Sequence, residues 1–507
     1  MLFDRTQNAK KTIQSGLLVK LLSTVVPFIM RTIIIYTLGN LYLGLGSLFS
    51  AILNTLNLAE LGIGSAMVFS MYKPAAENDT KTICALLNVY KKIYLVIGTV
   101  VLIIGLGLLP FLPDLIHGKY PDDINIYVLY VMQLLSAVAG YFFFAYRGSI
   151  LTAYQRADIA NIVTFITEFF MYLLQALSLI VFRNYYMYVF LILLRSIVYN
   201  LIVFQIVKKR FPALVASGTI DQDIKKQIIE KTSALAGHKV AVVIINSTDN
   251  ILISMLIGLN MVAIYNNYYY VVQAIAGILL LIFSGVTPIV GNYLITENND
   301  RISSLFDTLN YLNAFIIVIC CNCFMTMIQP FILLWTGEQN MFPMYMVVLF
   351  VVYFYTLRIR IVMNLFKDAA GIWEKDLVKA YAMALINLSI DIFLMQKIGI
   401  AAALISTIIT MVFAFFYEAV VVHKYVLKSK ILHFLRMNAL YLFIAVISCF
   451  SSAILMKYSF DNTIARLLTG GFVGSMVGIV FFVCMTCRCR EFKMSVTFVS
   501  DKLRRSR

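Results

Sequence analysis

Long apolar runs alternate with short polar intervals along the whole chain. Each run has at least the roughly 20 residues that a helix needs to cross a hydrocarbon core of about 30 Å. The pattern therefore predicts an all-α integral membrane protein with about 14 transmembrane helices. The predicted spans are residues 13–38, 45–71, 92–113, 122–146, 159–182, 184–207, 233–257, 262–294, 309–334, 343–363, 377–396, 399–422, 437–457 and 464–486.

The longest polar interval, residues 208–232, separates six spans from the next six. A shift of 219 positions places Lys20 on Lys239 and Gly39 on Gly258, so the first and seventh spans begin and end alike. Two copies with an even number of spans share one orientation, which predicts a pseudo-two-fold axis along the membrane normal. The expected parts are an N-lobe (1–207), a cytoplasmic linker (208–232), a C-lobe (233–422), two extra helices (423–486) and a basic cytoplasmic tail (487–507).

Charge gives the orientation of the spans. Of the 41 Lys and Arg residues, 32 fall into alternate gaps between spans, and cationic loops stay in the cytoplasm. Both termini are therefore expected on the cytoplasmic side of a bacterial plasma membrane. With 61% hydrophobic and 13% charged residues, the chain is not a soluble globular protein, and the inner loops account for its net charge of +16. The expected counter-surface is the anionic inner leaflet rather than nucleic acid.

Four cations are counted with neither set of gaps and lie inside spans, where an ionisable group is costly unless it faces protein or water. Lys20 and Arg31 are eleven residues apart, so one helical face carries both, separated by about 16 Å along the axis. Lys239 continues the pattern on the seventh span, and Arg195 lies in the sixth. Such cations suit an anion, although Lys20 can equally reach the inner interface.

Uncharged polar residues also recur on single helical faces, which predicts a hydrated central cavity. The cavity candidates are Asn57, Gln175, Asn246, Asn250, Asn266, Tyr270 and Gln273. Four acids, Glu60, Glu168, Asp249 and Asp391, are candidates for Na⁺ or H⁺ coupling. The alternative is that these acids pair with the buried cations and only hold helices together.

The sequence lacks the features of an enzyme or a cofactor protein. It contains no P-loop, no HExxH motif and no large outer loop that could form a catalytic domain. Cys484, Cys487 and Cys489 have nearly metal-ligand spacing, but no fourth ligand is near them in sequence, so no metal site is expected. We therefore predict a non-enzymatic protein without a resident cofactor.

Four segments resemble the polysaccharide-repeat-unit flippases of the multidrug/oligosaccharidyl-lipid/polysaccharide exporter superfamily, which serve O-antigen, capsule and teichoic-type polymers. The first, residues 38–83, is LGNLYLGLGSLFSAILNTLNLAELGIGSAMVFSMYKPAAENDTKTI. The others are AYRGSILTAYQRADIAN, TDNILISMLIGLNMVAIYNNYYYVVQAI and QPFILLWTGE.

The resemblance implies a two-lobed transporter that moves an undecaprenyl-pyrophosphate-linked oligosaccharide from the inner to the outer leaflet by alternating access. It implies that cavity cations bind the pyrophosphate, which falls here on Arg31, Lys239 and Arg195, with Lys20 as a further candidate. The last two spans would be peripheral and cover a groove for the lipid tail. Expected partners are the lipid-linked oligosaccharide, membrane lipids, and a polysaccharide polymerase and glycosyltransferases, with no nucleic acid.

Other functions remain open at this stage. A multidrug exporter of the same superfamily would carry amphipathic cations, which a cationic cavity disfavours. A flippase for the peptidoglycan precursor would differ only in the head group. A membrane glycosyl-transfer enzyme is disfavoured by the short outer loops, and a non-transporting scaffold would require packed, dry helix faces.

Overall fold

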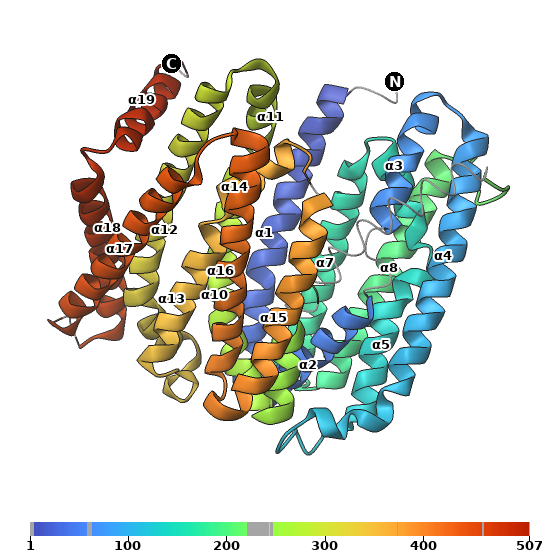
Figure 1. The fold of residues 1–507 in the computed structure, drawn as a ribbon. Coiled ribbons are helices and arrows are strands. Elements are labelled where there is room, and N and C mark those ends of the chain that lie inside the picture. Colours follow the sequence, from blue (N-terminus) through green and yellow to red (C-terminus); the bar gives the residue numbers. More distant parts are fainter. Residues whose placement is uncertain are drawn as a thin grey trace. The chain divides into compact units, whose positions relative to one another are not determined.

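The computed structural model describes residues 5–57, 63–220, 243, 247–372, 374–458 and 461–505. All regular structure in these residues is helical, and the chain divides into two compact units, Met1–Ala263 and Ile264–Arg507 (Figure 1). The main helices of the first unit are α1 (Arg5–Thr37), α2 (Asn40–Leu56), α3 (Ile63–Ala76), α4 (Thr80–Gly107), α5 (Ile126–Phe142), α6 (Gly148–Ala153), α7 (Ala157–Ile180) and α8 (Tyr185–Arg210).

The second unit contains most of α10 (Leu259–Ser284), which begins just before the boundary between the units. It continues with α11 (Thr287–Thr296), α12 (Asn299–Thr336), α13 (Met344–Arg358), α14 (Ile361–Ala369), α15 (Glu374–Ile398), α16 (Ala401–Val422), α17 (Ile431–Leu455), α18 (Thr463–Thr486) and α19 (Arg490–Arg505).

The predicted membrane architecture is confirmed, with one part of the span count left open. In the described residues, 11 helices are long and apolar enough to cross a membrane, and the bent pair α5 and α6 raises the number to 12. The other two predicted spans, 45–71 and 233–257, each include residues outside the described ranges. The chain is a multi-pass membrane protein, and the number fourteen stays a prediction.

Helix starts are set by short polar side chains in the gaps between apolar runs. Asn125, Asn184, Asn298 and Asn462 cap α5, α8, α12 and α18 by accepting hydrogen bonds from backbone N–H groups of the first turn. Asp79 caps α4 and also accepts a hydrogen bond from the Thr82 hydroxyl. These hydrogen bonds hold the pKa of the Asp79 carboxyl below its usual value.

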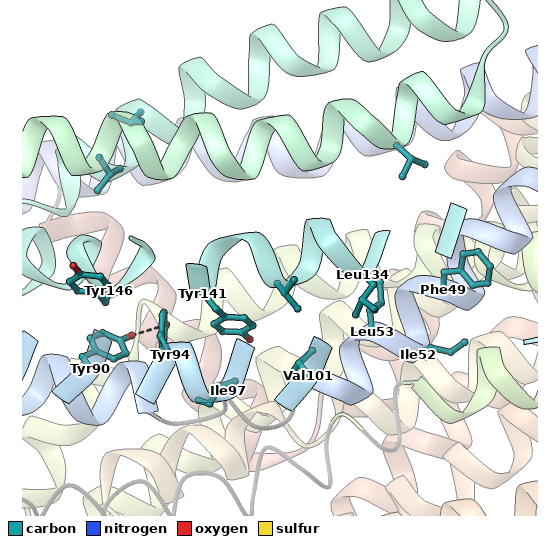
Figure 2. Close-up of a cluster of buried hydrophobic side chains, with 14 of the residues drawn as sticks. Phe49, Ile52, Leu53, Tyr90, Tyr94, Ile97, Val101, Leu134, Tyr141 and Tyr146 are labelled. Carbon is teal, nitrogen blue, oxygen red and sulfur yellow. Dashed lines mark hydrogen bonds between the residues drawn. The ribbon is translucent and has the colours of Figure 1, made fainter. Parts of the chain in front are cut away.

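Buried aromatic rings hold α2, α4 and α5 together in the first unit (Figure 2). The Tyr90 hydroxyl donates to the Tyr94 hydroxyl at 2.7 Å, and the Tyr94 ring packs edge-on against Tyr141 at 5.3 Å. Phe49 packs in the same way against Tyr130, also at 5.3 Å. Edge-to-face pairs add to the burial of their large apolar area, so this cluster fixes the three helices against one another.

The glycines that relate the two predicted repeats both have a positive φ. Gly39 has φ 100° and precedes α2, and Gly258 has φ 124° and precedes α10. Side chains rarely adopt this region, which favours glycine at both turns. The residues that follow also meet, since the Asn40 amide donates to Asn260 Oδ1 at 3.0 Å.

The end of the seventh predicted span is tied to the first unit by hydrogen bonds. The Ser254 hydroxyl donates to the Leu115 carbonyl at 2.7 Å, and the His117 N–H donates to the Ser254 carbonyl at 2.9 Å. The compact first unit therefore extends to Ala263. The expected lobe boundaries at 207 and 233 stay predictions, because 221–242 lies outside the described residues.

In the second unit, α18 packs closely along α12 through a row of glycines. A methyl group at Gly474 would lie 2.9 Å from Thr326 Oγ1 and 3.0 Å from the Asn322 carbonyl, so the helix backbones approach each other there. The Thr326 hydroxyl donates to the Gly470 carbonyl at 2.8 Å. Small residues with a hydroxyl partner are a common means of packing helices in membranes.

Candidate functional site

Arg195 of α8 lies against α7 in the first unit. Its Nη1 is 3.4 Å from Glu168 Oε1 and 3.3 Å from the Tyr172 hydroxyl, and its guanidinium carbon lies 5.7 Å from the Tyr172 ring centroid. Glu168 and Tyr172 are one turn apart on α7, so a single helical face presents both groups. The side chains of Arg195 and Glu168 are 30% and 20% exposed, which leaves the pair open on one side.

Arg31 of α1 belongs to the same cluster. It is half-buried, and the Tyr188 hydroxyl of α8 lies within electrostatic range of both Arg31 and Arg195. Tyr185, one turn earlier on α8, also lies within range of Arg31. We call Arg31, Glu168, Tyr172, Tyr188 and Arg195 the arginine cluster; it holds two cations and one acid, which leaves a net positive charge in the membrane-spanning region.

The structure describes one of the other two predicted pyrophosphate ligands. Lys20 lies eleven residues before Arg31 on α1, and its side chain is exposed. Lys239 lies outside the described residues, as do Glu60 and Asn246.

The remaining candidates of the first unit are mostly engaged in packing. Asn57 Oδ1 accepts a hydrogen bond from the Tyr141 hydroxyl at 3.2 Å and so joins α2 to α5. Gln175 is only 1% exposed, which places its side chain among packed helices in this structure. Asn250 is half-buried, and its neighbour Asp249 is buried.

In the second unit, α10 and α13 face each other through tyrosines. Gln273 Nε2 donates to the Tyr353 hydroxyl at 2.6 Å, and the Tyr269 and Tyr353 rings stack at 5.9 Å. Tyr265 stacks on Tyr269 at the same separation, 5.9 Å. We call Tyr265, Tyr269, Gln273 and Tyr353 the tyrosine platform. The predicted cavity residues Asn266 and Tyr270 lie on the same helix and are half-buried.

Arg358 is a cation that the sequence analysis did not single out as a site residue. It is the last residue of α13, only 8% exposed, and lies within electrostatic range of Tyr269 and Tyr353. No carboxylate forms an ion pair with it in the part of the chain that the structure describes. The helix pair α13 and α14 forms a single span, Met344–Ala369, so Arg358 belongs to the membrane segment.

A second missed group is a buried ionic network that joins α14, α15 and α16. The Arg360 guanidinium binds Glu418 with both Nε and Nη2, and Lys379 Nζ lies 2.7 Å from Glu418 Oε1. Lys379 and Lys367 also bind Asp376, at 2.8 and 2.6 Å. Every acid in this network has two cationic partners, which is the arrangement of a structural clamp.

Asp391, a predicted coupling residue, lies on α15. It is 0% exposed, and Asn387, one turn earlier, donates to Ser406 Oγ at 3.1 Å and Thr407 Oγ1 at 3.3 Å. In the described residues, Asn387 Oδ1 is buried and accepts no hydrogen bond. The role of Asp391 in ion coupling stays a prediction.

The second unit also contains a large apolar groove between α12, α13, α16 and α17. Its volume is about 710 Å³, and Met325, Val352, Phe416, Leu442 and Val446 are among the side chains that line it. A groove of this size and composition accommodates hydrocarbon.

Comparison with known proteins identifies the family. A family model described as polysaccharide biosynthesis protein matches residues 9–293, more than half of the chain. The chain belongs to this family. The matched region contains the whole arginine cluster, and the sequence-based assignment to the polysaccharide branch of the superfamily is confirmed.

Solved structures show the same fold at low sequence identity. Lipid II flippase MurJ, in an inward closed conformation, matches with TM-score 0.67 and 14% identity over 94% of this chain and 99% of that chain. An inward-facing multidrug resistance transporter of the MATE family, MOP superfamily, matches with TM-score 0.63 and 13% identity over 80% of this chain and 95% of its own.

A variant of the Vibrio cholerae MATE transporter VcmN matches with TM-score 0.53 and 16% identity over 83% and 98% of the two chains. Among curated proteins, no sequence matches the chain. The fold is therefore that of MurJ and the MATE transporters, and these solved relatives are membrane transporters or flippases.

Proposed function

We propose that this protein is a flippase that moves undecaprenyl-pyrophosphate-linked oligosaccharide repeat units from the inner to the outer leaflet of a bacterial plasma membrane. The observation that carries the proposal is the arginine cluster, in which Arg31 and Arg195 approach the same tyrosine hydroxyl. Its net positive charge suits an anionic cargo, and the family's description names polysaccharide biosynthesis.

The pyrophosphate is the part of the cargo that is most costly to move through hydrocarbon without the protein. Charges and polar groups cannot enter hydrocarbon without partners that replace water. Arginine is suited to phosphate oxygens because its planar guanidinium makes paired, charge-assisted hydrogen bonds. In the proposal Arg31 and Arg195 bind the pyrophosphate, and Glu168 and Tyr172 orient Arg195 until the cargo arrives. Lys239 and Lys20 remain further candidates for the same role.

Taken by itself, the second unit offers a sugar chain the chemistry of the tyrosine platform, although Tyr265 and Tyr353 are each only 3% exposed in this structure. Sugar rings pack their C–H faces against aromatic side chains, and their hydroxyls bond to amides such as Gln273 and to phenolic hydroxyls such as that of Tyr353. Tyr265, Tyr269 and Tyr353 supply three rings in successive stacks, each separated by 5.9 Å. The polyprenyl tail would lie in the apolar groove beside α17, which keeps hydrocarbon in a hydrocarbon environment.

Transport would proceed by alternating access, with the two halves rocking around the bound head group. Moving about two negative charges outward across an interior-negative membrane gains roughly 4 to 5 kcal/mol per 100 mV. The membrane potential therefore supplies a driving force without a chemical reaction, and no catalytic residue is assigned. Asp391, Asp249, Glu168 and Glu60 remain candidates for Na⁺ or H⁺ coupling.

The test is deletion of the gene in its own host. Loss of surface polysaccharide together with accumulation of lipid-linked repeat units in the inner leaflet supports the proposal. Normal polymer in the deletion strain, without a second exporter, contradicts it. In the cell, a polymerase and the glycosyltransferases that build the repeat unit would be the functional partners.

A flippase for the peptidoglycan precursor is the second candidate, because the MurJ fold covers 94% of this chain. Both cargoes contain a polyprenyl pyrophosphate, so the arginine cluster suits either one. The same deletion separates them: failure of wall synthesis indicates the peptidoglycan precursor, whereas loss of surface polymer with an intact wall indicates the repeat unit. A multidrug exporter would instead change drug resistance and leave both polymers intact.

A further inference from the structure

Three side chains with metal-ligand chemistry meet where the C-terminal helix α19 joins the rest of the second unit. Asp307 comes from α12, His433 from the first turn of α17 and Glu491 from the first turn of α19. Their candidate ligand atoms all lie within 4.8 Å of one another. His433 Nε2 is 2.8 Å from Glu491 Oε1, so two of the three already touch.

The two carboxylates of this cluster have an imidazole beside them and no bonded Lys or Arg in the described residues. Glu491 is 3% exposed and Asp307 is half-buried, yet no Lys or Arg in the described residues forms an ion pair with either. Arg490 lies within electrostatic range of Asp307 but is not bonded to it. The buried acids Asp376 and Glu418, by contrast, each have two cationic partners within 3.0 Å. Two neighbouring carboxylates whose bonded partner is an imidazole can accept an external cation.

We propose that Asp307, His433 and Glu491 form a binding site for a divalent transition-metal ion, with Zn²⁺ as the best representative. One imidazole nitrogen and two carboxylate oxygens are a donor set that zinc accepts, whereas Mg²⁺ and Ca²⁺ prefer oxygen alone. Zinc bonds of about 2.1 Å in tetrahedral geometry place ligand atoms about 3.4 Å apart. The widest pair of ligand atoms, at most 4.8 Å apart, would need to close by up to about 1.4 Å, and the 2.8 Å pair of His433 and Glu491 would open by about 0.6 Å. The His433 side chain is 59% exposed, which gives the ion a path from solvent.

The consequence is a metal-dependent attachment of α19. Without the ion, α19 is held by weaker contacts: the Phe492 ring lies 6.3 Å from the Tyr311 ring, and the Ser304 hydroxyl contacts Met494 Sδ at 3.2 Å. A bound ion would link α19 to α12 and α17 through three bonds from three helices. This inference concerns the C-terminal helix and does not depend on the proposed transport function.

The test measures zinc binding to the purified full-length chain in detergent. After treatment with a chelator and equilibrium dialysis against low-micromolar Zn²⁺, the wild-type chain should retain one ion that His433→Ala, Asp307→Asn and Glu491→Gln each lose. Removing a ligand should weaken binding at least about tenfold, because even outer partners of metal ligands contribute that much. His117→Ala is the matched control, since it removes an exposed histidine elsewhere in the chain. Excess Mg²⁺ should not displace the zinc.

Two further arms make the result decisive. Replacing Cys484, Cys487 and Cys489 by serine should leave the zinc in place. If this serine variant loses the ion while His433→Ala binds it fully, the thiols are the ligands and the proposal is overturned. Hydrogen exchange should slow in residues 490–500 when Zn²⁺ is added to the wild-type chain, and not in His433→Ala. Folding of each variant is checked by its elution as a monodisperse species. No bound zinc in the wild-type chain, or equal zinc in wild type and His433→Ala, also overturns it.

Discussion

Arg195 interacts with Glu168 and Tyr172 through the same Nη1 atom, at 3.4 and 3.3 Å, so neither contact saturates its guanidinium. If Glu168 only orients Arg195, then Glu168→Gln keeps the side-chain shape and most of the transport activity. A partly exposed ion pair contributes at most about 1 kcal/mol, so transport should fall by no more than about fivefold. Flipping assays with equal amounts of each protein measure this. Complete loss of transport by correctly inserted Glu168→Gln would instead make the acid part of the coupling machinery.

Substitutions of Arg31 can separate the effect of its positive charge from the effect of its planar guanidinium group. Arg31→Ala removes a charge-assisted interaction with the pyrophosphate, and export of repeat units should fall about 10- to 100-fold. Arg31→Lys keeps the charge but loses the planar fork, so intermediate export is expected. Surface polysaccharide is quantified in a deletion strain that carries each variant, with protein levels in the membrane as the control. Full export by Arg31→Ala would remove this residue from the mechanism.

The site residues that the sequence identified are single ionisable groups within apolar runs. Arg31 and Arg195 stand out in this way, and the structure places both near Tyr188. Arg358 and Glu418 lie near span ends, where a sequence alone cannot separate a continued helix from a polar loop. The chain continues from α13 into α14 as one span, and Arg358 is buried within it. One sequence feature could have identified Glu418. It is a single acid in an apolar span, and this span follows an interval that contains five cations.

At the scale of helices, the buried network around Glu418 holds α14, α15 and α16 together. Glu418→Gln leaves Arg360 and Lys379 without their shared carboxylate, and breaking a buried pair in this way costs about 3–5 kcal/mol. We expect a clearly lower thermal unfolding midpoint in detergent. Glu297→Gln is the control, because its pair with Arg301 is exposed and should contribute about 1 kcal/mol or less. Equal midpoints for the two variants would show that the network is not a clamp.

The contact between α12 and α18 depends on small residues. A side chain at Gly474 meets backbone of α12 at 3.0 Å, so Gly474→Leu should push the helices apart and destabilise the fold by about 1–3 kcal/mol. Gly107→Leu is the matched control, since nothing lies within 4 Å of the added atom there. Thermal unfolding of both variants checks the prediction. A midpoint for Gly474→Leu equal to that of the control would mean that α18 packs loosely.

The approximate positions of most spans could be predicted, because apolar length is a local property of the sequence. The predicted spans 159–182 and 464–486 correspond to Ala157–Ile180 and Thr463–Thr486. The metal cluster could not be predicted, because His433 and Glu491 are 58 residues apart and only the packing of α17 and α19 brings them together. Spacing along the chain drew attention to the nearby cysteines instead.

For the whole molecule, the account requires that a positively charged site receive the head group while the tail stays in lipid. The family match and the MurJ-like fold establish the architecture, and the arginine cluster supplies the chemistry. Coupling to an ion would add a dependence on Na⁺ or H⁺ gradients, whereas drive by potential alone would not. Imposing each gradient separately on proteoliposomes distinguishes these cases.

The most direct test of the central claim is a leaflet assay with a fluorescent polyprenyl-pyrophosphate oligosaccharide in proteoliposomes. The wild-type chain should move this lipid between leaflets, and inorganic pyrophosphate in excess should inhibit it. The double variant Arg31→Ala with Arg195→Ala should be inactive while retaining the wild-type unfolding midpoint. Wild-type rates of lipid movement in that double variant would contradict the account.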